Sequence, residues 1–193
     1  MKGNPTKLDE NKLWEHFKNG DDTAFLQLYQ AIYQSLFAYG VKLSNNKELT
    51  KDAIQDIFMD LWEKRHKIVS VKKVKSYLFT YLRRKLMKDL VDKKIDLDKV
   101  SDQHFELSFS QEKTIIENEI KLELTENLQK ALKKLTPRQR EIIHLKFYEK
   151  MDYAELAEVL QIKQQSVVNL SYEAIKLLRA ILISLVIAAF FFI

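Results

Sequence analysis

The most informative polar residues of this chain lie between Met151 and Arg179. Four of them recur at intervals of three or four residues, the spacing that places side chains on one face of a helix: Gln165, Asn169, Tyr172 and Lys176. Amides pair with base edges, and hydroxyl groups and cations bind phosphates, so this face has the chemistry needed to read duplex DNA. A merely solvated helix face is the alternative, but a face rich in Gln and Asn rather than Glu and Lys favours DNA binding.

The elements around this polar face form a helix-turn-helix pattern. A short helix is predicted over Asp152–Leu160, a turn at Gln161-Ile162, and a longer second helix from about Lys163. The other side of the second helix carries an apolar stripe that would form the shared core: Val167, Leu170, Ala174, Leu177 and Leu178. Gln161 occupies a turn position that often holds Gly, and a left-handed backbone there should cost about 1 kcal/mol.

A second group of polar residues lies on one side of a helix predicted at about residues 50–66. Its acids and its amide recur with helical spacing: Asp52, Gln55, Asp56, Asp60 and Glu63. Carboxylates at this spacing can act as acid-base pairs or metal ligands, but on a solvated helix they usually do neither. Because Phe58 and Met59 interleave the acids, we interpret this side as a protein-docking face.

Two Glu-x-x-His pairs raise the alternative of a metal enzyme. Glu63 and His66 form one pair and Glu141 and His144 the other, and such pairs make up half of a di-iron carboxylate site in a four-helix bundle. The other half, two further inward glutamates, has no counterpart in the sequence, and a His at a predicted helix end is favoured there as a cation. The sequence also lacks a Gly-rich phosphate loop and a Ser-His-Asp arrangement. We therefore predict no catalytic residue, no metal site, no cofactor and no small-molecule substrate, with a di-iron enzyme as the remote alternative.

The composition favours an all-α protein with charged segments of opposite sign. Among 193 residues there are only three Gly and two Pro, which is few turn-forming residues for a many-stranded sheet. The absence of Cys fits a reducing cytoplasm, and the first twelve residues lack the apolar core of a signal peptide. Residues 64–94 contain twelve Lys and Arg against two Asp, whereas residues 95–129 contain nine acids against three Lys. This alternation predicts two small helical domains that face nucleic acid, joined by an acidic connector.

Apolar periodicity gives the boundaries of these domains. Helices are predicted at about residues 24–43, 50–66 and 71–91, and then from about 111 to 135 and from Thr136-Pro137 to about 147. The predicted organisation is an amino-terminal extension (1–23), a first domain (24–91), a linker (92–124), a second domain with the helix-turn-helix (125–179) and an apolar tail (180–193).

The tail contains no charge and only one polar residue, Ser184. A membrane-spanning helix needs about 20 apolar residues, so residues 180–193 alone are too short. Exposed apolar residues in this number would promote association. We therefore predict that the tail extends the last helix and is buried against the second domain or a partner, and we rank a membrane-surface anchor last.

Four blocks of the sequence resemble the extracytoplasmic-function (ECF) group of bacterial sigma-70 factors. They lie at Asp52–Arg65, Tyr77–Leu90, Leu135–Phe147 and Asp152–Arg179, in the order and at the separation typical of that family. The resemblance implies a cytoplasmic subunit that binds core RNA polymerase, directs it to promoter DNA and helps to melt the duplex. It also implies an anti-sigma factor, often membrane-anchored in this family, that covers the polymerase-binding faces.

The resemblance implies roles for particular residues. The polymerase-binding face would comprise Asp52, Gln55, Asp56, Phe58, Met59 and Trp62. Contact with the −10 element and its melting would involve Arg65, Lys67, Lys72, Lys73, Tyr77, Phe79, Tyr81, Arg83 and Arg84. Within this group, the resemblance implies that the basic loop His66–Val74 captures a flipped −10 base. Contact with the −35 element would involve Arg138, Arg140, Lys163, Gln164, Gln165, Ser166, Val168, Asn169, Tyr172 and Lys176, with the two arginines on phosphates.

One aromatic residue of the −10 group is singled out by its position. Tyr77 and Tyr81 fit the predicted buried stripe of their helix, whereas Phe79 does not. Phe79 is therefore the best candidate to stack on an unpaired base.

A helix-turn-helix regulator that works without polymerase is the second interpretation. Such a regulator would share the carboxy-terminal motif and bind operators unaided, but it would need no docking face on the helix at residues 50–66. Binding to core polymerase therefore discriminates between the two.

Overall fold

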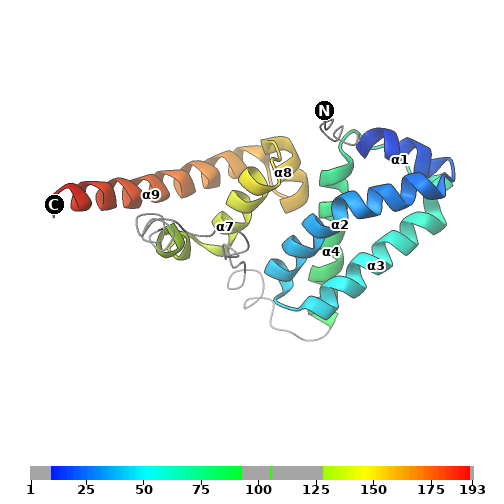
Figure 1. The fold of residues 1–193 in the computed structure, drawn as a ribbon, viewed down its shortest axis with the longest axis horizontal. Coiled ribbons are helices and arrows are strands. Elements are labelled where there is room, and N and C mark those ends of the chain that lie inside the picture. The colour runs from blue at the N-terminus through cyan, green and yellow to red at the C-terminus, as the bar shows by residue number, and fades with distance from the viewer. Residues whose placement is uncertain (1–9, 93–104, 106–127, 192–193) are drawn as a thin grey trace, which may run out of the picture. The chain divides into compact units, whose positions relative to one another are not determined.

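The computed structural model describes residues 10–92, residue 105 and residues 128–191, with side chains described as far as residue 181. The regular elements in these ranges are all helical, which confirms the predicted fold class (Figure 1). The chain forms two compact units. The first contains α1 to α4, and the second contains α7, most of α8 and α9.

The first unit is a bundle of α1 (Glu10–Lys18), α2 (Asp22–Ser44), α3 (Lys47–Lys64) and α4 (Val74–Asp92). A single 3-10 turn, Arg65–Lys67, follows α3. α2 contacts each of the other three helices, and the three helices predicted for this domain are confirmed to within a few residues. The core consists of aliphatic side chains that are almost fully buried: Leu28, Ile32, Leu36, Ile54, Ile57, Leu61, Leu78, Leu82 and Leu86.

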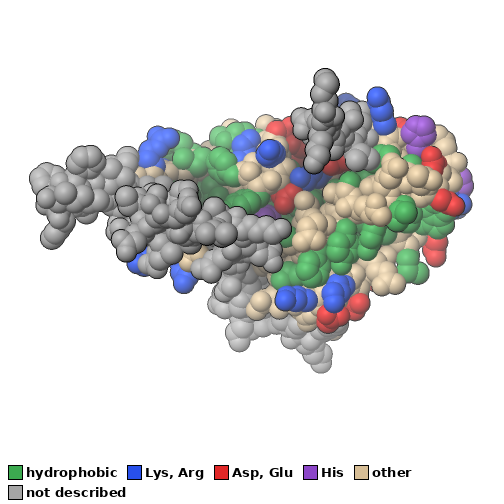
Figure 2. All heavy atoms as spheres, viewed as in Figure 1, with side chains coloured by type: hydrophobic (Ala, Val, Ile, Leu, Met, Phe, Trp, Pro, Cys, Tyr) green, Lys and Arg blue, Asp and Glu red, His purple; other side chains and the backbone are tan. Residues whose placement is uncertain are grey.

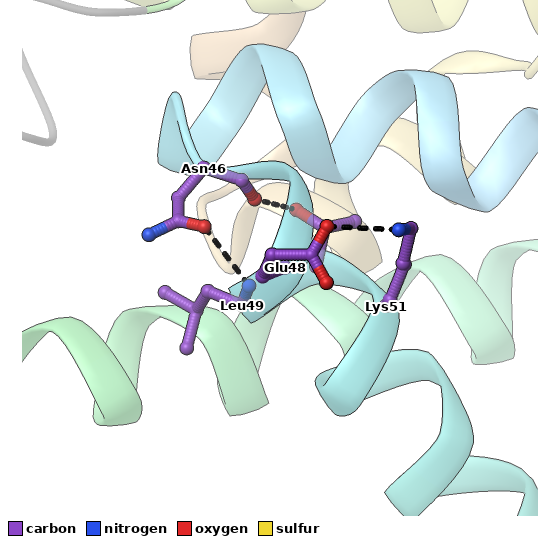
Figure 3. A network of polar contacts seen from close by, with 5 residues as sticks. Asn46, Glu48, Leu49 and Lys51 are labelled. Carbon is purple, nitrogen blue, oxygen red and sulfur yellow. Dashed lines mark hydrogen bonds and ion pairs between the residues drawn. The ribbon is translucent and has the colours of Figure 1, made fainter.

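Short polar side chains set where α2 and α3 begin. Asp21 caps α2 by accepting hydrogen bonds from two backbone N–H groups of its first turn. After α2 ends, Asn45 has a left-handed backbone, and Asn46 caps α3 by accepting a hydrogen bond of 3.0 Å from the Leu49 N–H group (Figure 3). Each such cap contributes about 1 kcal/mol to stability. The boundary between the helices predicted at about residues 24–43 and 50–66 is confirmed, and α3 begins three residues earlier than predicted.

α1 lies in the segment for which no helix was predicted. Its apolar residues occur at helical spacing, and two of them, Trp14 and Phe17, are fully buried in the first unit. Burying two large aromatic side chains contributes roughly 2–3 kcal/mol each. The amino-terminal segment from Glu10 is therefore part of the first unit rather than an appendage.

The second unit is built on a helical segment at residues 128–133, α7 (Pro137–Ile143), a π-helical turn (His144–Tyr148), α8 (Tyr153–Leu160) and α9 (Gln164–Phe191). Thr136 and Gln139 form a reciprocal capping box at the start of α7, and Pro137 occupies its first turn as predicted. The apolar stripe of α9 joins a core that also contains Leu132, Leu135 and Ile143.

The structure describes only part of the predicted linker and of the predicted tail. Residues 93–104 and 106–127, which include most of the predicted linker and the start of the predicted 111–135 helix, lie outside the described residues. α9 continues without a break into the tail as far as Phe191, so the prediction that the tail extends the last helix is confirmed. The predicted burial of its side chains falls outside the described part. Within that part, no helix combines the length and apolar character required to cross a membrane.

Candidate nucleic-acid interface and docking face

The turn between α8 and α9 has the conformation predicted from the sequence. Gln161 has a φ of 55°, so its backbone is left-handed although the residue is not Gly. The Ile162 N–H group donates to the Ala157 carbonyl at 3.2 Å, and the Val167 N–H group donates to the Lys163 carbonyl at 3.2 Å. These bonds end the first helix and start the second, as a helix-turn-helix requires.

The polar stripe of α9 faces solvent along its whole length. Gln165, Asn169, Tyr172 and Lys176 are all exposed, whereas Val167 and Ala174 on the other side are fully buried. The Gln165 amide nitrogen donates a hydrogen bond of 3.0 Å to the Asn169 amide oxygen. The other −35 candidates lie at the start of the same helix, where Lys163, Gln164 and Ser166 are exposed and Val168 is half-buried. The predicted division of this helix into two faces is confirmed.

The two arginines predicted to bind phosphates are engaged within the second unit. The Arg138 guanidinium pairs with the buried Glu141 carboxylate at 3.1 Å. Arg140 donates from Nε to the Phe105 carbonyl at 2.6 Å and from Nη1 to the Leu135 carbonyl at 2.7 Å. A phosphate contact by Arg140 would require at least one of these bonds to be exchanged.

In the first unit, the basic segment at residues 65–73 consists of the 3-10 turn and the irregular residues that lead to α4. Lys67, Lys72 and Lys73 are exposed, and so is Val69, with 80% of its surface accessible. Arg65 is half-buried because its guanidinium lies over the Trp62 ring, 4.2 Å from the ring centroid. On α4, Arg84 is exposed and Arg83 is half-buried.

The aromatic residues of α4 differ from the prediction in one respect. Phe79 is fully buried, and its ring packs against Tyr39 of α2 at a centroid distance of 5.0 Å. The prediction that Phe79 is exposed for stacking on a base is therefore wrong. Its position was expected to be exposed, but Phe79 lies three residues before Leu82 and seven before Leu86, on the buried side of α4 that packs against α2. Tyr77 and Tyr81 are half-buried.

Tyr81 also links α4 to α3 through a carboxylate. Its hydroxyl donates a hydrogen bond of 2.6 Å to Asp60, which is also paired with Lys64. Burial and this bond raise the pKa of the Tyr81 hydroxyl, so the group stays protonated. The hydrogen bonds from Lys64 and from Tyr81 lower the pKa of Asp60.

The exposed side of α3 presents the polar residues predicted for docking. Asp52, Gln55 and Asp56 are exposed, Met59 has 54% of its surface accessible, and Trp62 is half-buried. A pocket of about 310 Å³ adjoins this side, lined by Asp56, Ile57, Met59, Asp60, Glu63, Tyr81 and Lys85. The lining includes the apolar side chains of Ile57 and Met59 beside carboxylates. Of these carboxylates, Asp56 pairs with Lys85 at 2.9 Å and Asp60 pairs with Lys64.

Phe58 is the exception on this helix. It was predicted as a docking contact, but only 3% of its surface is accessible, and its ring is covered by Phe25 and Tyr29 of α2. The prediction of direct contact by Phe58 is corrected, because the side chain holds α2 against α3. Its influence on docking is through the position of α3.

A row of aromatic side chains on α2 was missed from the sequence. Phe25, Tyr29, Tyr33 and Phe37 follow at intervals of four residues, and each is half-buried. The Tyr29 and Tyr33 rings lie 5.2 Å apart, and the Tyr33 and Phe37 rings stack at 5.9 Å. Figure 2 shows apolar side chains gathered along the face where α2 and α3 run together. The docking face therefore extends from α3 onto α2, and the four-residue aromatic repeat was the available signal.

The two Glu-x-x-His pairs lie in different units. Glu63 and His66 are exposed in the first unit, whereas Glu141 and His144 are buried in the second. Among the described residues, no group of three His, Asp or Glu side chains is placed to hold a metal ion.

Comparison with known proteins assigns each unit to a family model. Residues 28–94 match the model for sigma-70 region 2, and residues 125–178 match the model for sigma-70 region 4. A search of the curated proteins finds no match.

Two solved structures are similar to the whole fold. CnrH, solved in complex with the cytosolic domain of CnrY, aligns with a TM-score of 0.58 at 20% identity, over 91% of this chain and 97% of CnrH. The sigma factor RpoE of Bartonella quintana, solved with the anti-sigma factor NepR, aligns with a TM-score of 0.57 at 22% identity, over 82% of this chain and 96% of RpoE.

Proposed function

The chain belongs to the sigma-70 family of transcription initiation factors, since the two family models together match more than half of it, and we propose how its two units share the work of such a factor. As a sigma factor of the ECF type, it acts with core RNA polymerase on promoter DNA. In our proposal the first unit binds polymerase and the −10 element, and the second unit reads the −35 element.

The polar stripe of α9 is the observation that carries the proposal for the −35 element. Two amides one helical turn apart, Gln165 and Asn169, can each pair with an adenine edge in the major groove. Tyr172 and Lys176 continue the same exposed face and would contact the sugar-phosphate backbone. Because the apolar stripe behind them is packed in the core, this face is held in place before DNA arrives.

The side of α3 supports a polymerase-docking role. Of its exposed carboxylates, Asp52 and Asp56, the second pairs with Lys85 at 2.9 Å and would exchange that pair for one with a basic group of polymerase. Gln55 adds an exposed amide and Met59 an adaptable apolar contact. Charge-assisted hydrogen bonds to a basic partner contribute about 1.5–3 kcal/mol each. A helix-turn-helix regulator would have no use for such a face.

We assign the −10 element to the basic segment at residues 65–73 and to the half-buried aromatic residues beside it. Exposed lysines attract phosphates, and a strand separated from its partner can be held by stacking on aromatic rings. Trp62 and Tyr77 lie on either side of the segment and remain partly accessible, so they replace Phe79 as the stacking candidates.

We also infer that an anti-sigma factor controls this protein in the cytoplasm. Both similar structures are complexes with a second protein, and in one of them that protein is an anti-sigma factor. An apolar and aromatic face of the kind on α2 and α3 is a suitable surface for such a partner.

Polymerase binding and promoter-specific transcription test the proposal together. The wild-type chain should co-purify with core polymerase, and Asp52→Ala with Asp56→Ala should weaken the complex by about tenfold or more. Asp92→Ala is the matched control, because Asp92 is an exposed carboxylate of the same unit in the last turn of α4 and not on α3. Tight and specific binding of duplex by the free chain, with no affinity for polymerase, would instead establish an operator-binding regulator. Binding of stoichiometric iron would establish the enzyme alternative.

A further inference from the structure

α1 packs against the residues on both sides of the basic segment at residues 65–73. The buried Phe17 ring lies 6.2 Å from the Trp62 ring, and Trp62 in turn lies under the Arg65 guanidinium. At the other end, the Trp14 ring meets the Tyr77 ring edge-on at 5.4 Å. The residues that precede and follow the segment are thus both packed against one short helix.

A third contact reaches the middle of the segment. The Lys18 ammonium group donates a hydrogen bond of 2.6 Å to the Ser70 hydroxyl, across 52 positions of sequence. Lys18 also lies 3.5 Å from Glu15 one turn earlier, and its side chain is only 18% accessible. Residues 68–71 have no regular secondary structure to hold them, so this bond is the specific polar restraint on Ser70 among the described contacts.

The turn after α1 is shaped to the same segment. Gly20 has a φ of 90°, a conformation that other residues rarely adopt. A side-chain carbon placed on it would lie 3.9 Å from both the Arg65 and the His66 side chains. The end of α1 therefore lies directly against the start of the basic segment.

We propose that Lys18 is a positioning residue which, through Ser70, holds the segment at 65–73 so that the exposed Val69 meets an unpaired base between flanking lysines. Val69 is the neighbour of Ser70 and has 80% of its surface accessible. An apolar side chain at the tip of a basic segment can pack on the face of a base while Lys67 and Lys72 bind the adjacent phosphates. This inference rests on the assignment of the segment to the −10 element.

The energetic reason for such a restraint is conformational. A free segment of this length would lose backbone entropy on binding a base, because each residue that becomes ordered loses conformational freedom. The hydrogen bond from Lys18 orders Ser70 before DNA binds, which removes part of that entropy loss. Lys18 should therefore speed base capture although it makes no contact with DNA. Removing one hydrogen bond should then slow open-complex formation about 3- to 10-fold.

The test uses holoenzyme assembled with the full chain and compares Lys18→Met, Ser70→Ala and the double variant. Each single change should slow open-complex formation on duplex promoter by a similar factor, and the double variant should be no slower than either. Lys18→Arg, which can still donate to Ser70, should retain most of the rate. Lys51→Met is the matched control, because Lys51 is a helical lysine paired with a glutamate three residues earlier but contacts no loop residue in any described bond.

A second measurement separates positioning from folding. Promoters that lack one base at a time in the −10 element are compared for each variant, and the wild type should show a large loss at one position. In Lys18→Met and in Ser70→Ala the loss at that position alone should shrink, because capture is already impaired. A merely destabilised protein would lose activity equally on all these promoters, and so would overturn the proposal.

The remaining outcomes are also distinct. If the wild type shows no position-specific loss, the assignment of the segment to base capture fails, and the role of Lys18 fails with it. If the wild type shows the loss but the variants keep it unchanged, or if their effects multiply in the double variant, only the Lys18–Ser70 inference fails.

Discussion

Replacement of Gln165 by Ala should change promoter preference at two adjacent sites on DNA, one strongly and one weakly. The direct effect is loss of a bidentate amide contact with a base, which is worth about 1–3 kcal/mol of discrimination, or roughly 5- to 150-fold. The indirect effect comes from the hydrogen bond of 3.0 Å that Gln165 donates to Asn169. That bond joins two exposed side chains, so its net value lies at the low end of the range, about 0.5 kcal/mol or twofold.

The base contacts of Gln165 and Asn169 should be largely independent of each other. The Asn169 amide oxygen has two lone pairs, so it can accept from Gln165 and from a base at the same time. Asn169→Ala should therefore lose its own base contact and leave Gln165 able to make its contact. The double variant should lose both preferences, with a departure from additivity below about 1 kcal/mol.

The assay is transcription or binding by holoenzyme on promoters that carry every base at each −35 position. Lys176→Ala is the matched control on the same stripe, because a phosphate contact carries no sequence information and its loss should weaken all promoters alike. Uniform loss from both amide variants, with base preferences unchanged, would refute the assignment of this face to base readout.

Three further substitutions test the packing of the first unit by urea unfolding. Phe79→Ala should lower the free energy of unfolding by about 3–5 kcal/mol, because the ring is fully buried, and a pre-melted promoter should not restore its activity. Gly40→Ala should destabilise by about 1–3 kcal/mol, because the new carbon would lie 2.5 Å from Thr50 Cγ2; no change would show that α2 can shift. Tyr81→Phe should destabilise by about 1 kcal/mol at pH 7 through loss of the bond to Asp60. The pKa of Asp60 in the folded protein is lowered below 3.8, so the difference in free energy of unfolding between the wild type and Tyr81→Phe should persist above pH 3.8 and disappear as the pH falls through the pKa of folded Asp60. A difference that is constant with pH would exclude Asp60 as the cause.

The parts of the fold that were predictable depend on neighbours in sequence. Helical periodicity located α2, α3 and α4, and Thr136 with Pro137 located the start of α7, because each signal lies within a turn or two of the feature it sets. The two faces of α9 and the left-handed backbone at Gln161 were predictable for the same reason.

Two side chains were misplaced although helical spacing places them, and one contact lay beyond any local pattern. Phe79 precedes Leu82 by three residues and Leu86 by seven, so its burial follows from the apolar periodicity of α4. Phe58 follows Ile54 by four residues and precedes Leu61 by three, so the same periodicity places it on the buried side of α3, although acids surround it in the sequence. The bond between Lys18 and Ser70 joins positions too far apart for any local pattern to indicate.

Arg140 was predicted to contact a DNA phosphate, but its guanidinium already donates hydrogen bonds within the second unit. Its two bonds to the Phe105 and Leu135 carbonyls are each charge-assisted, and bonds to charged groups contribute about 1.5–3 kcal/mol each. A phosphate would have to replace at least one of them, so the net gain on binding DNA is smaller than for an arginine in water. Phe105 is itself buried, with its ring 5.5 Å from that of His144, so release of its carbonyl would also disturb an apolar contact. The energetic balance therefore favours a structural role for Arg140, which holds the Phe105 backbone within the second unit. The exposed Lys163 and Lys176 are better candidates for contact with DNA phosphates.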